Sequence, residues 1–410
     1  MRIEPKHEIA AVTICATNYV GKALALRQSY LAYHTESDFY ILIVDREHNR
    51  FKCLESDVNI LWVEDLGITD FSHYAMKFDI IELNTNVKAS ILSLLLQKYN
   101  MVLYLDPDIY FYGTLQPVLR ELESHSIVVT PHTLAPVMDG KVPSDIDFLR
   151  MGSFNLGFVG VAKCEEAFRF LDWWSKRCLE FGFYEPQIGL AVDQKWIDLV
   201  PSFFPGLKIL RDPGLNVAFW NLHERAISRQ DKMWVVNKEW PLRFFHFSSF
   251  NPEKPHVIAK KQSRFAVESR PDLHELLDSY ATKLRDNEDA LYSNCAYSFN
   301  HFDDGMYITP SLRRVYAALE SQFPSNESPF LHGSSLQRFA IAHHLAGKKY
   351  KMSKLPTFKE IGAYSKSVRA ISIALRFVLR VVGPNKYFSL MRYMAYISSI
   401  RNQSDIFSRR

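Results

Sequence analysis

The stretch MVLYLDPDIYFYG, residues 101–113, decides which fold we expect of this chain. It opens with five apolar residues, and an apolar run of this length is typical of a strand buried in a parallel sheet. Asp106 and Asp108 follow at once, so the strand would deliver two carboxylates to one edge of the sheet. Hard divalent cations prefer carboxylate oxygens and commonly bridge them to substrate phosphates. The pattern therefore predicts a Mn²⁺ or Mg²⁺ site, although ordinary turns also place two aspartates at this spacing.

Helix-like segments alternate with apolar runs on both sides of this stretch. Buried strands are predicted at residues 9–16, 39–44, 60–63, 101–105 and 127–130, and helices at residues 20–34 and 85–99. A strand, a helix and a second strand in succession form a right-handed β-α-β unit. Such alternation predicts an α/β fold with a Rossmann-like sheet and helices on both faces. Ligands of these folds bind beyond the carboxyl ends of the strands.

The chain is long enough for two or three domains, since it has 410 residues, of which 47% are hydrophobic and 23% charged. The alternation of strands and helices fades near residue 260. Helical spacing of apolar residues follows at residues 272–285 and 311–323. We therefore expect an α/β domain at residues 1–265, a helical accessory region at residues 266–355, and basic amphipathic helices at residues 362–410.

The last 49 residues, 362–410, differ in charge from the rest of the chain. They carry nine basic side chains and one acid, Asp405, a net charge of +8. Because the whole chain carries +4, the residues before them sum to −4 and lack the broad positive field of nucleic-acid binders. Gly383 and Pro384 separate two amphipathic, helix-length pieces. These helices would either pack as a hairpin on the second domain or lie on an anionic membrane surface.

The five cysteines are widely spaced and form no CxxC pair, so the sequence predicts neither a disulfide framework nor a zinc site. The first twenty residues lack the features of an export signal. No uncharged apolar run reaches the roughly 18 residues of a membrane span. These observations predict a cytoplasmic protein that lies, at most, peripherally on the inner face of the cell membrane.

Seven segments between residues 8 and 260 resemble, in the same order, the GT-A nucleotide-sugar transferases, in particular glycosyltransferase family 8 and its bacterial relatives. The segments are AVTICATNYV (11–20), IVD (43–45), TNVK (85–88), YLDPDIYFYG (104–113), FNLGFVGV (154–161), AVDQKWIDLVP (191–201) and FFHFSSFNPEKPH (244–256). The resemblance implies a GT-A fold with a mixed sheet and a metal-dependent transfer of a sugar from a nucleotide diphosphate donor. It further implies a UDP-sugar donor, a glycan or glycolipid acceptor in cell-surface polysaccharide synthesis, and retention of the anomeric configuration.

The last segment resembles the family pattern H-x-x-G-x-x-K-P, whose His ligates the metal and whose Lys contacts the donor diphosphate. On this sequence those residues are His246 and Lys254, so the implied metal ligands are Asp106, Asp108 and His246. The segment departs from the family where Ser249 replaces a glycine and His256 a tryptophan, and its spacing is longer. Taken by itself, a histidine after two phenylalanines is more often a core residue bonded to backbone.

The resemblance also assigns roles around the donor and the transferred sugar. Donor-binding roles fall on Ala16, Thr17, Asn18 and Tyr19 around the base, Asp45 near uracil or ribose, Lys88, Lys254 and Gly157, and catalytic roles on Asn155, Asp193 and Gln194. Phe154 to Gly157 would be a loop lining the sugar pocket, where a glycine lets the backbone approach the ligand. Structural alternatives remain open: Asp45 would cap a turn, Lys88 would lie on a solvated helix face, and Asp193 would cap a helix.

Two other classes of function remain open. A nucleotidyltransferase of sugar phosphates shares the α/β sheet and the acidic metal ligands, but it usually carries a glycine-rich loop after the first strand, and ATNYVGKA (residues 16–23) is poor in glycine. A phosphate-binding P-loop is absent from the sequence. A non-catalytic glycan-binding or membrane-binding protein would keep the fold without a working metal site.

Overall fold

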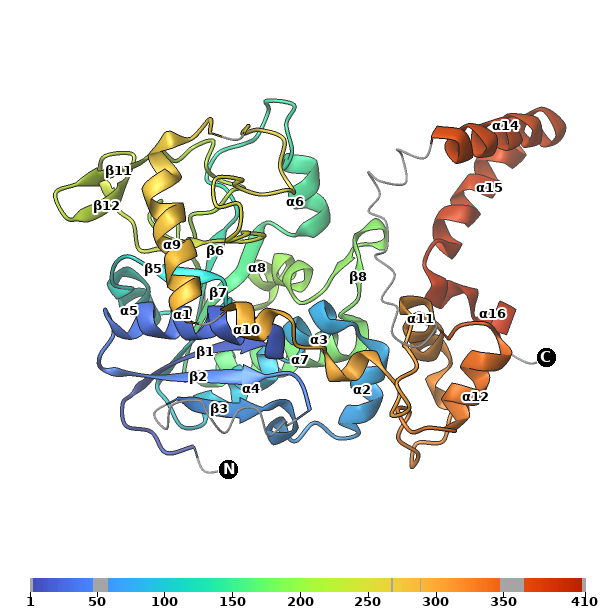
Figure 1. The fold of residues 1–410 in the computed structure, drawn as a ribbon, viewed down its shortest axis with the longest axis horizontal. Coiled ribbons are helices and arrows are strands. Elements are labelled where there is room, and N and C mark those ends of the chain that lie inside the picture. Colours follow the sequence, from blue (N-terminus) through green and yellow to red (C-terminus); the bar gives the residue numbers. More distant parts are fainter. Residues whose placement is uncertain (1–2, 47–57, 267, 288, 347–364, 408–410) are drawn as a thin grey trace. The chain divides into compact units, whose positions relative to one another are not determined.

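The computed structural model describes residues 3–46, 58–266, 268–287, 289–346 and 365–407 (Figure 1). The chain divides into two compact units, Met1–Phe71 with Ile80–Ser298, and Ser72–Asp79 with Phe299–Arg410. The first unit extends beyond the boundary expected at residue 265, because helices α9 (His274–Asp286) and α10 (Asp289–Ser293) pack against α1 (Val20–Leu31). Parts of the expected accessory region and basic tail, residues 347–355, 362–364 and 408–410, lie outside the described residues.

Seven strands of the first unit form one sheet. In sequence order they are β1 (Ile9–Cys15), β2 (Ser37–Ile43), β3 (Asn59–Trp62), β4 (Met101–Leu105), β6 (Ile127–Pro131), β7 (Phe154–Ala162) and β10 (Leu207–Ile209). The spatial order is β10-β6-β7-β4-β1-β2-β3. β7 runs antiparallel to its neighbours β4 and β6, and the other pairs are parallel. The α/β fold with a mixed sheet is thus confirmed.

Helices lie on both faces of this sheet. The helices of this unit are α1, α3 (Ile80–Asn86), α4 (Lys88–Leu96), α5 (Gln116–Leu122), α6 (Asp145–Met151), α7 (Glu165–Phe181), α8 (Val200–Phe203), α9 and α10, and not all of them lie on the sheet: α6 and α8 contact short flanking elements. Leu103 and Leu105 of β4 pack with α1 and α5 in one buried cluster. Because side chains alternate along a strand, Tyr104 points to the opposite face, where α4 lies and packs on α7.

The remaining short strands flank the sheet. β5 (Ile109–Phe111) pairs with β14 (Phe244–His246), β8 (Tyr184–Glu185) pairs with β9 (Leu190–Ala191), and β11 (Ile227–Gln230), β12 (Met233–Val236) and β13 (Trp240–Pro241) form a small sheet. The pairing of β5 with β14 matters most for function, because β5 begins just after the two aspartates. It joins parts of the chain that are far apart in sequence.

The chain order changes direction between β1 and β4. From β1 the chain proceeds outward to β2 and β3, and it then returns to place β4 on the other side of β1. In open α/β sheets the crevice at such a switch point is the usual ligand site. The turns that follow β1 and β4 therefore face a common crevice.

The predicted elements agree with the structure in type and differ at their ends. The strands at residues 9–16, 39–44, 60–63, 101–105 and 127–130 are confirmed as β1, β2, β3, β4 and β6. The helix predicted at residues 85–99 is divided, because α3 ends at Asn86 and α4 begins at Lys88. The loop expected at Phe154 to Gly157 is wrong, since these residues open the strand β7. A continuous apolar run in the middle of a sheet explains why they are extended.

The second unit is helical. Its helices are α2 (Phe71–Lys77), α11 (Pro310–Leu319), α12 (Ser335–Ala342), α14 (Ser365–Val382), α15 (Pro384–Ile397) and α16 (Ser404–Phe407). The two amphipathic helices predicted around Gly383 are confirmed as α14 and α15, which contact each other. Among the described residues, no helix combines the length and the apolar content that a membrane span requires.

Candidate functional site

Asp106, Asp108 and His246 meet at the edge of the sheet where β4 ends. The Nε2 atom of His246 lies 3.0 Å from Asp108 Oδ1 and 3.5 Å from Asp106 Oδ2. One ligand atom from each of the three residues lies within 4.8 Å of the other two. The imidazole is 4% exposed, whereas the two carboxylates are partly open to the crevice. These three groups could hold one divalent metal ion, as the sequence predicted.

The short β5–β14 pair explains how His246 reaches the aspartates. In its antiparallel register His246 stands opposite Ile109, the residue after Asp108. The backbone N–H of Phe247 donates to the carbonyl of Asp108 at 2.8 Å, and the N–H of His246 donates to Val217 at 2.8 Å. The histidine is therefore fixed by main-chain hydrogen bonds before any ligand is considered.

Gly157 of β7 makes room for this imidazole. A Cβ atom at Gly157 would lie 2.4 Å from His246 Cε1 and 2.8 Å from Asn155 Oδ1, which is far inside contact distance. The sequence analysis expected Gly157 to let the backbone approach a ligand. The structure instead shows that its missing side chain accommodates His246, so any larger residue would displace the ring.

Asn216 orients the ring of His246. Its Nδ2 donates to Thr130 Oγ1 at 2.9 Å and to Asn155 Oδ1 at 3.0 Å, which leaves its Oδ1 to accept from His246 Nδ1 at 3.3 Å. A proton on Nδ1 leaves the lone pair of Nε2 directed at the carboxylates and available to a cation. Polar groups that fix a ligating histidine in this way are a regular part of metal sites. The edge of Trp220 packs on the same ring, with centroids 5.1 Å apart.

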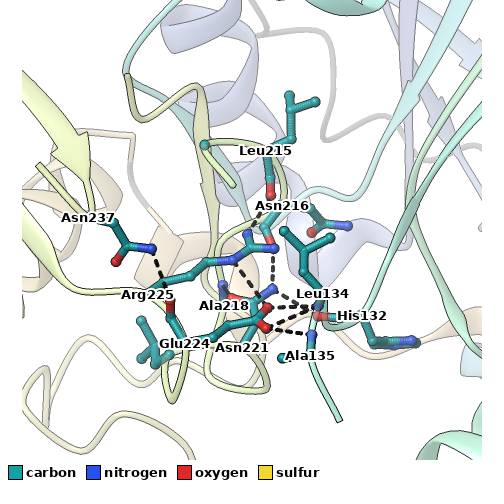
Figure 2. Close-up of polar contacts among 12 residues, drawn as sticks. His132, Leu134, Ala135, Leu215, Asn216, Ala218, Asn221, Glu224, Arg225 and Asn237 are labelled. Carbon is teal, nitrogen blue, oxygen red and sulfur yellow. Dashed lines mark hydrogen bonds and ion pairs between the residues drawn. The ribbon is translucent and has the colours of Figure 1, made fainter. Parts of the chain in front are cut away.

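The loop that carries Asn216 is held by a buried polar network (Figure 2). Asn221 donates to the carbonyls of Asn216 and His132 at 2.9 and 3.0 Å and accepts from the N–H of Ala218. The Glu224 carboxylate accepts from the backbone at residues 134 and 135, and Arg225 donates to Leu215. Asn216 itself has a φ of 51°, a conformation that asparagine tolerates better than most residues. Sequence reasoning missed Asn216, and the only signal was an Asn in a turn-like segment.

The charges of the three residues are coupled. Burial disfavours a charged imidazole, but the carboxylates of Asp108 and Asp106 outweigh burial and raise the pKa of His246. Burial likewise opposes ionisation of Asp108, yet His246 holds the pKa of that carboxyl below its ordinary value. The Tyr104 hydroxyl donates to Asp106 Oδ1 at 2.6 Å. The site is therefore built to keep two negative charges next to a buried histidine.

A cavity of about 370 Å³ opens on the aspartate side of the site. It lies at the switch point and is lined by the turns after β1 and β4 and by α3: Ile14, Cys15, Ala16, Asn18, Tyr19, Ile80, Ile81, Asn84, Thr85, Tyr104, Asp106, Pro107 and Asp108. Of the predicted donor-binding residues, Ala16, Asn18 and Tyr19 reach it together with both aspartates. The buried Oδ1 of Asn18 has no hydrogen-bond partner among the described residues, which fits an acceptor that a ligand would satisfy.

Thr17 and Asp45 do not line this cavity. The Asp45 carboxylate is fully buried and accepts from the hydroxyl of Thr17 at 2.8 Å, from the N–H of Arg46 at 3.0 Å, and from the N–H and hydroxyl of Ser298. These donors occupy about the four lone-pair positions that a carboxylate offers. The geometry favours the structural alternative, in which Asp45 organises its own turn.

Lys88 and Asp193 form a buried ion pair beside the site. Lys88 Nζ lies 2.6 Å from Asp193 Oδ2, donates to the carbonyl of Leu156 at 2.7 Å and sits 4.1 Å above the ring of Tyr104. The family resemblance implied that Lys88 binds the donor and that Asp193 is catalytic, and neither residue lines one of the two cavities. The alternative of a solvated helix face is wrong, because Lys88 is 2% exposed. The alternative in which Asp193 caps a helix is also wrong, since its side chain makes no capping hydrogen bond.

Gln194 and Lys254 are placed differently. Gln194 accepts from the N–H of Leu156 at 3.2 Å and donates to the carbonyl of Met151 at 2.9 Å, so its amide braces the start of β7. Lys254 is exposed in the loop after β14 and lines neither of the two cavities beside the site. The structure therefore brings Gln194 close to the site and leaves Lys254 on the surface.

A second cavity, also of about 370 Å³, is lined by residues that contact the neighbours of His246. It is lined by His132, Val142, Pro143, Asp147, Phe148, Arg150, Met151, Asn155, Tyr184, Pro186, Gln194, Phe219, Trp220, Ser248 and Lys261. Asn155 and Trp220 connect it to His246, through Asn216 and through ring contact. Burial lowers the pKa of His132 to about 4, so this histidine is neutral at pH 7. The candidate metal site therefore borders the first cavity directly and the second only through the neighbours of His246.

Replacing Asn216 by glycine is expected to weaken Mn²⁺ binding by about 10- to 100-fold, because the ring of His246 loses the acceptor that fixes its tautomer. Glycine keeps the positive φ without strain, so the change isolates the loss of the side chain. Titration calorimetry with Mn²⁺ measures the effect.

Asp231→Gly is the matched control, since Asp231 also has a positive φ, at 53°, and lies exposed in the turn between β11 and β12, outside the network of Figure 2. Asn216→Asp, which keeps an acceptor for Nδ1, should recover part of the affinity. If Asn216→Gly binds Mn²⁺ with the affinity of the wild type, the network does not orient the ring of His246.

Comparison with known proteins gives relatives and structural neighbours. No protein-family model matches the chain. The Bacillus subtilis (strain 168) protein YfnF, described as uncharacterized, is 26% identical over 274 residues, which cover 65% of this chain and 89% of YfnF. YfnD of the same organism, also uncharacterized, is 26% identical over 208 residues, which cover 49% of this chain and 62% of YfnD. These relatives carry no established activity.

Among solved structures, the galactosyltransferase LgtC in complex with donor and acceptor sugar analogs matches with a TM-score of 0.43 and 13% identity, over 70% of this chain and 97% of that chain. The chain is similar to glycosyltransferases. The glycosyltransferase GlyE of Streptococcus pneumoniae TIGR4 matches with a TM-score of 0.40 and 14% identity, over 68% of this chain and 62% of that chain.

Proposed function

We propose that this chain is a metal-dependent glycosyltransferase that moves a sugar from a nucleotide diphosphate donor, a UDP-sugar, to a glycan or glycolipid acceptor. The observation that carries the proposal is the convergence of Asp106, Asp108 and His246 at the switch-point edge, where both aspartates line one cavity and Trp220, which packs on His246, lines a second. A reaction that joins two substrates at a phosphate-binding cation could use the first cavity for the donor and the second for the acceptor.

The first cavity would hold the nucleotide. Its volume lies in the range of small-molecule sites, and its walls are mostly apolar with a few polar groups. The ring of Tyr19, 40% exposed, offers a surface on which a base could stack, and the buried Asn18 Oδ1 offers an acceptor. A uracil imide would donate to such an acceptor. Ala16, Asn18 and Tyr19 are therefore the donor-binding residues that we retain, and Thr17 and Asp45 support them from behind.

The donor diphosphate would lie at the three-residue site. Asp106, Asp108 and His246 would hold a Mn²⁺ or Mg²⁺ ion, which when bound stabilises the negative charge on the departing nucleoside diphosphate. Tyr104 fixes the carboxylate of Asp106, and Asn216 fixes the ring of His246, so little reorganisation is needed when the ligand arrives. Lys254 would have to move from its exposed position to contact the phosphates.

The transferred sugar would lie next to Asn155 and Gln194, with the acceptor in the second cavity. The Lys88–Asp193 pair would support this region from beneath, since Lys88 holds the backbone of Leu156. We propose retention of the anomeric configuration, with the leaving phosphate taking the proton of the acceptor hydroxyl on the same face of the sugar. Proton NMR of the product anomer tests this stereochemistry, and an inverted product would contradict it.

Donor turnover tests the proposed function most directly. With Mn²⁺, the full chain should bind and slowly hydrolyse at least one member of a panel of UDP- and GDP-sugars, and EDTA should abolish the turnover. Calorimetry with UDP and GDP separates binding from chemistry. If no nucleotide sugar binds with any divalent metal, the proposal fails and a non-catalytic role is favoured.

We further propose that α14 and α15 hold the protein on an anionic membrane surface. Large apolar side chains on both helices are exposed, among them Ile371, Phe377, Val381, Phe388 and Tyr396. Basic side chains of the same helices, including Arg369, Arg376, Arg380, Lys386 and Arg392, are exposed too. Exposed apolar surface beside basic charge suits the boundary between lipid headgroups and acyl chains. Such an attachment would place the enzyme at the inner face of the membrane, where cell-surface polysaccharides are assembled.

Changing Arg369, Arg376, Arg380, Lys386 and Arg392 to glutamine should release the protein from vesicles. Each basic residue near an anionic surface contributes about 1 kcal/mol, so the combined change should weaken binding by at least about a hundredfold. Flotation with vesicles of phosphatidylglycerol and phosphatidylethanolamine measures this.

Substitution is preferable to deletion, because the segment that follows α15 packs on α11. Vesicles of neutral phosphatidylcholine serve as the control, and equal binding to neutral and anionic vesicles would refute an electrostatic attachment.

A further inference from the structure

The second cavity differs from the first in charge. The first cavity is lined by the carboxylates of Asp106 and Asp108 and by no Lys or Arg. The second is lined by two basic residues, Arg150 and Lys261, and by one acid, Asp147. Asp147 already accepts from the N–H and hydroxyl of Ser144, both at 2.9 Å, in the cap of α6. With two cations and one carboxylate, the lining of the second cavity carries a net positive charge.

Arg150 and Lys261 come from separate parts of the chain. Arg150 lies in the last turn of α6, and Lys261 lies in the irregular segment after β14. Neither side chain forms an ion pair with a carboxylate among the described residues, and both are exposed at the cavity. Nearby, Arg264 is paired with Asp139. Two cations that line one cavity without ion-pair partners among the described residues are available to an anion bound there.

The other walls of this cavity are aromatic. Phe148 stacks on His132 with centroids 5.2 Å apart, Trp220 meets His132 edge to face at 5.5 Å, and Phe219 packs on Trp220. Trp220 is 5% exposed, and its indole N–H has no hydrogen-bond partner among the described residues. Buried donors of this kind are usually met by a ligand or by water. Aromatic walls with an unused donor suit a sugar ring with hydroxyl acceptors.

From these features we propose that the second cavity binds an acceptor sugar that carries an anionic group, a phosphate or a carboxylate, recognised by Arg150 and Lys261. The inference rests on the proposed function, because it identifies the second cavity as the acceptor side. The anionic group would stay on the acceptor throughout and would serve only for recognition. The aromatic walls would hold the ring while the two cations select the charge.

Calorimetry on the full chain in EDTA tests the charge selection apart from any metal chemistry. The probes are galactose and glucose, their 6-phosphates, galacturonic and glucuronic acid, and inorganic phosphate. We expect at least one anionic sugar to bind about tenfold tighter than its neutral parent, since charge-assisted hydrogen bonds are about twice as strong as neutral ones. Inorganic phosphate should bind more weakly than that sugar, because it lacks a ring to contact the aromatic walls. Comparison of the sugar 6-phosphates with the uronic acids identifies which anion is selected.

The double variant Arg150→Gln, Lys261→Gln should abolish the preference and leave binding of UDP with Mn²⁺ unchanged. Lys232→Gln, an exposed lysine in the turn between β11 and β12, is the matched control and should keep the preference. Equal binding of neutral and anionic sugars, a preference that survives in the double variant, or no binding of any sugar would each overturn the inference. Failure of UDP to bind with Mn²⁺ would instead count against the proposed function, so the two failures are distinguishable.

Discussion

Replacing Asp108 by alanine is expected to lower sugar transfer by at least about a thousandfold, because the change removes a ligand from the group that stabilises the departing phosphate. Asp108 Oδ1 is the carboxylate atom nearest to His246 Nε2, at 3.0 Å. Its loss would leave two of the three ligands. The main chain at this position should survive, since the carbonyl of Asp108 still accepts from Phe247.

Initial rates of donor turnover with Mn²⁺ measure this effect, with circular dichroism as the check on folding. Asp172→Ala on α7 is the control, because that carboxylate is 62% exposed and forms only a surface pair with Lys176. A folded Asp108→Ala protein that turns over the donor within tenfold of the wild-type rate would refute the assigned role.

Replacing Lys88 by methionine is expected to destabilise the fold by about 3–5 kcal/mol at pH 7, because it leaves the Asp193 carboxylate buried without its partner. The two side chains are 2% and 3% exposed, so water cannot replace the lost cation. Methionine fills much of the space of the lysine stem, which limits the packing defect. Urea denaturation measures the free energy of unfolding.

The destabilisation should depend on pH in a defined direction. Burial already raises the pKa of Asp193 above its ordinary value of 3.8, although Lys88 opposes the shift. Without Lys88 the pKa in the folded state rises further, while in the unfolded state it stays ordinary. The variant therefore loses stability as the pH rises from the ordinary value through the raised one, and its deficit is smallest in acid.

The double variant Lys88→Met, Asp193→Asn removes both charges and should recover a large part of the stability at pH 7. An equal deficit at pH 4 and pH 8 in the single variant, or no recovery in the double variant, would show that packing and not charge explains the loss. Either result would also weaken the view of Lys88 as a support of the site.

The parts of the site that adjoin a strand could be predicted from sequence. Met101 to Leu105 is a continuous apolar run, and the two carboxylates follow it directly, so local pattern fixes both the strand and its end. The family resemblance placed Ala16, Thr17, Asn18 and Tyr19 around the base, and all but Thr17 line the first cavity. Local pattern thus located the aspartates, whereas the role of the turn after β1 came from the resemblance.

Long-range geometry could not be predicted from residues alone. His246 reaches the site through β14, whose three residues give no distinct strand pattern, and its role came only from the family resemblance. Position 157 requires a glycine because the ring of His246, which belongs to a strand far away in the sequence, occupies the space of a side chain there. Asn216 orients that ring from an irregular loop. Each of these features depends on which distant segments pack together, and a local pattern does not encode that.

The burial of charged residues could not be predicted. The family resemblance placed Lys88 on a helix in contact with the donor, yet its ammonium is enclosed with Asp193. Asp45 follows a strand, as a ligand-binding acid would, yet its carboxylate is used by the protein itself. Charged side chains are seldom fully enclosed, so their enclosure follows from tertiary contacts and not from their spacing.

The pairing of β5 with β14 has a consequence for the maturation of the enzyme. The two strands are three residues each; His246 ends β14, and Asp106 and Asp108 lie in the turn just before β5. A bound ion would join these two segments in addition to their main-chain hydrogen bonds, and it would thereby favour the native state by mass action. Metal supply would then govern the stability of the protein as well as its turnover.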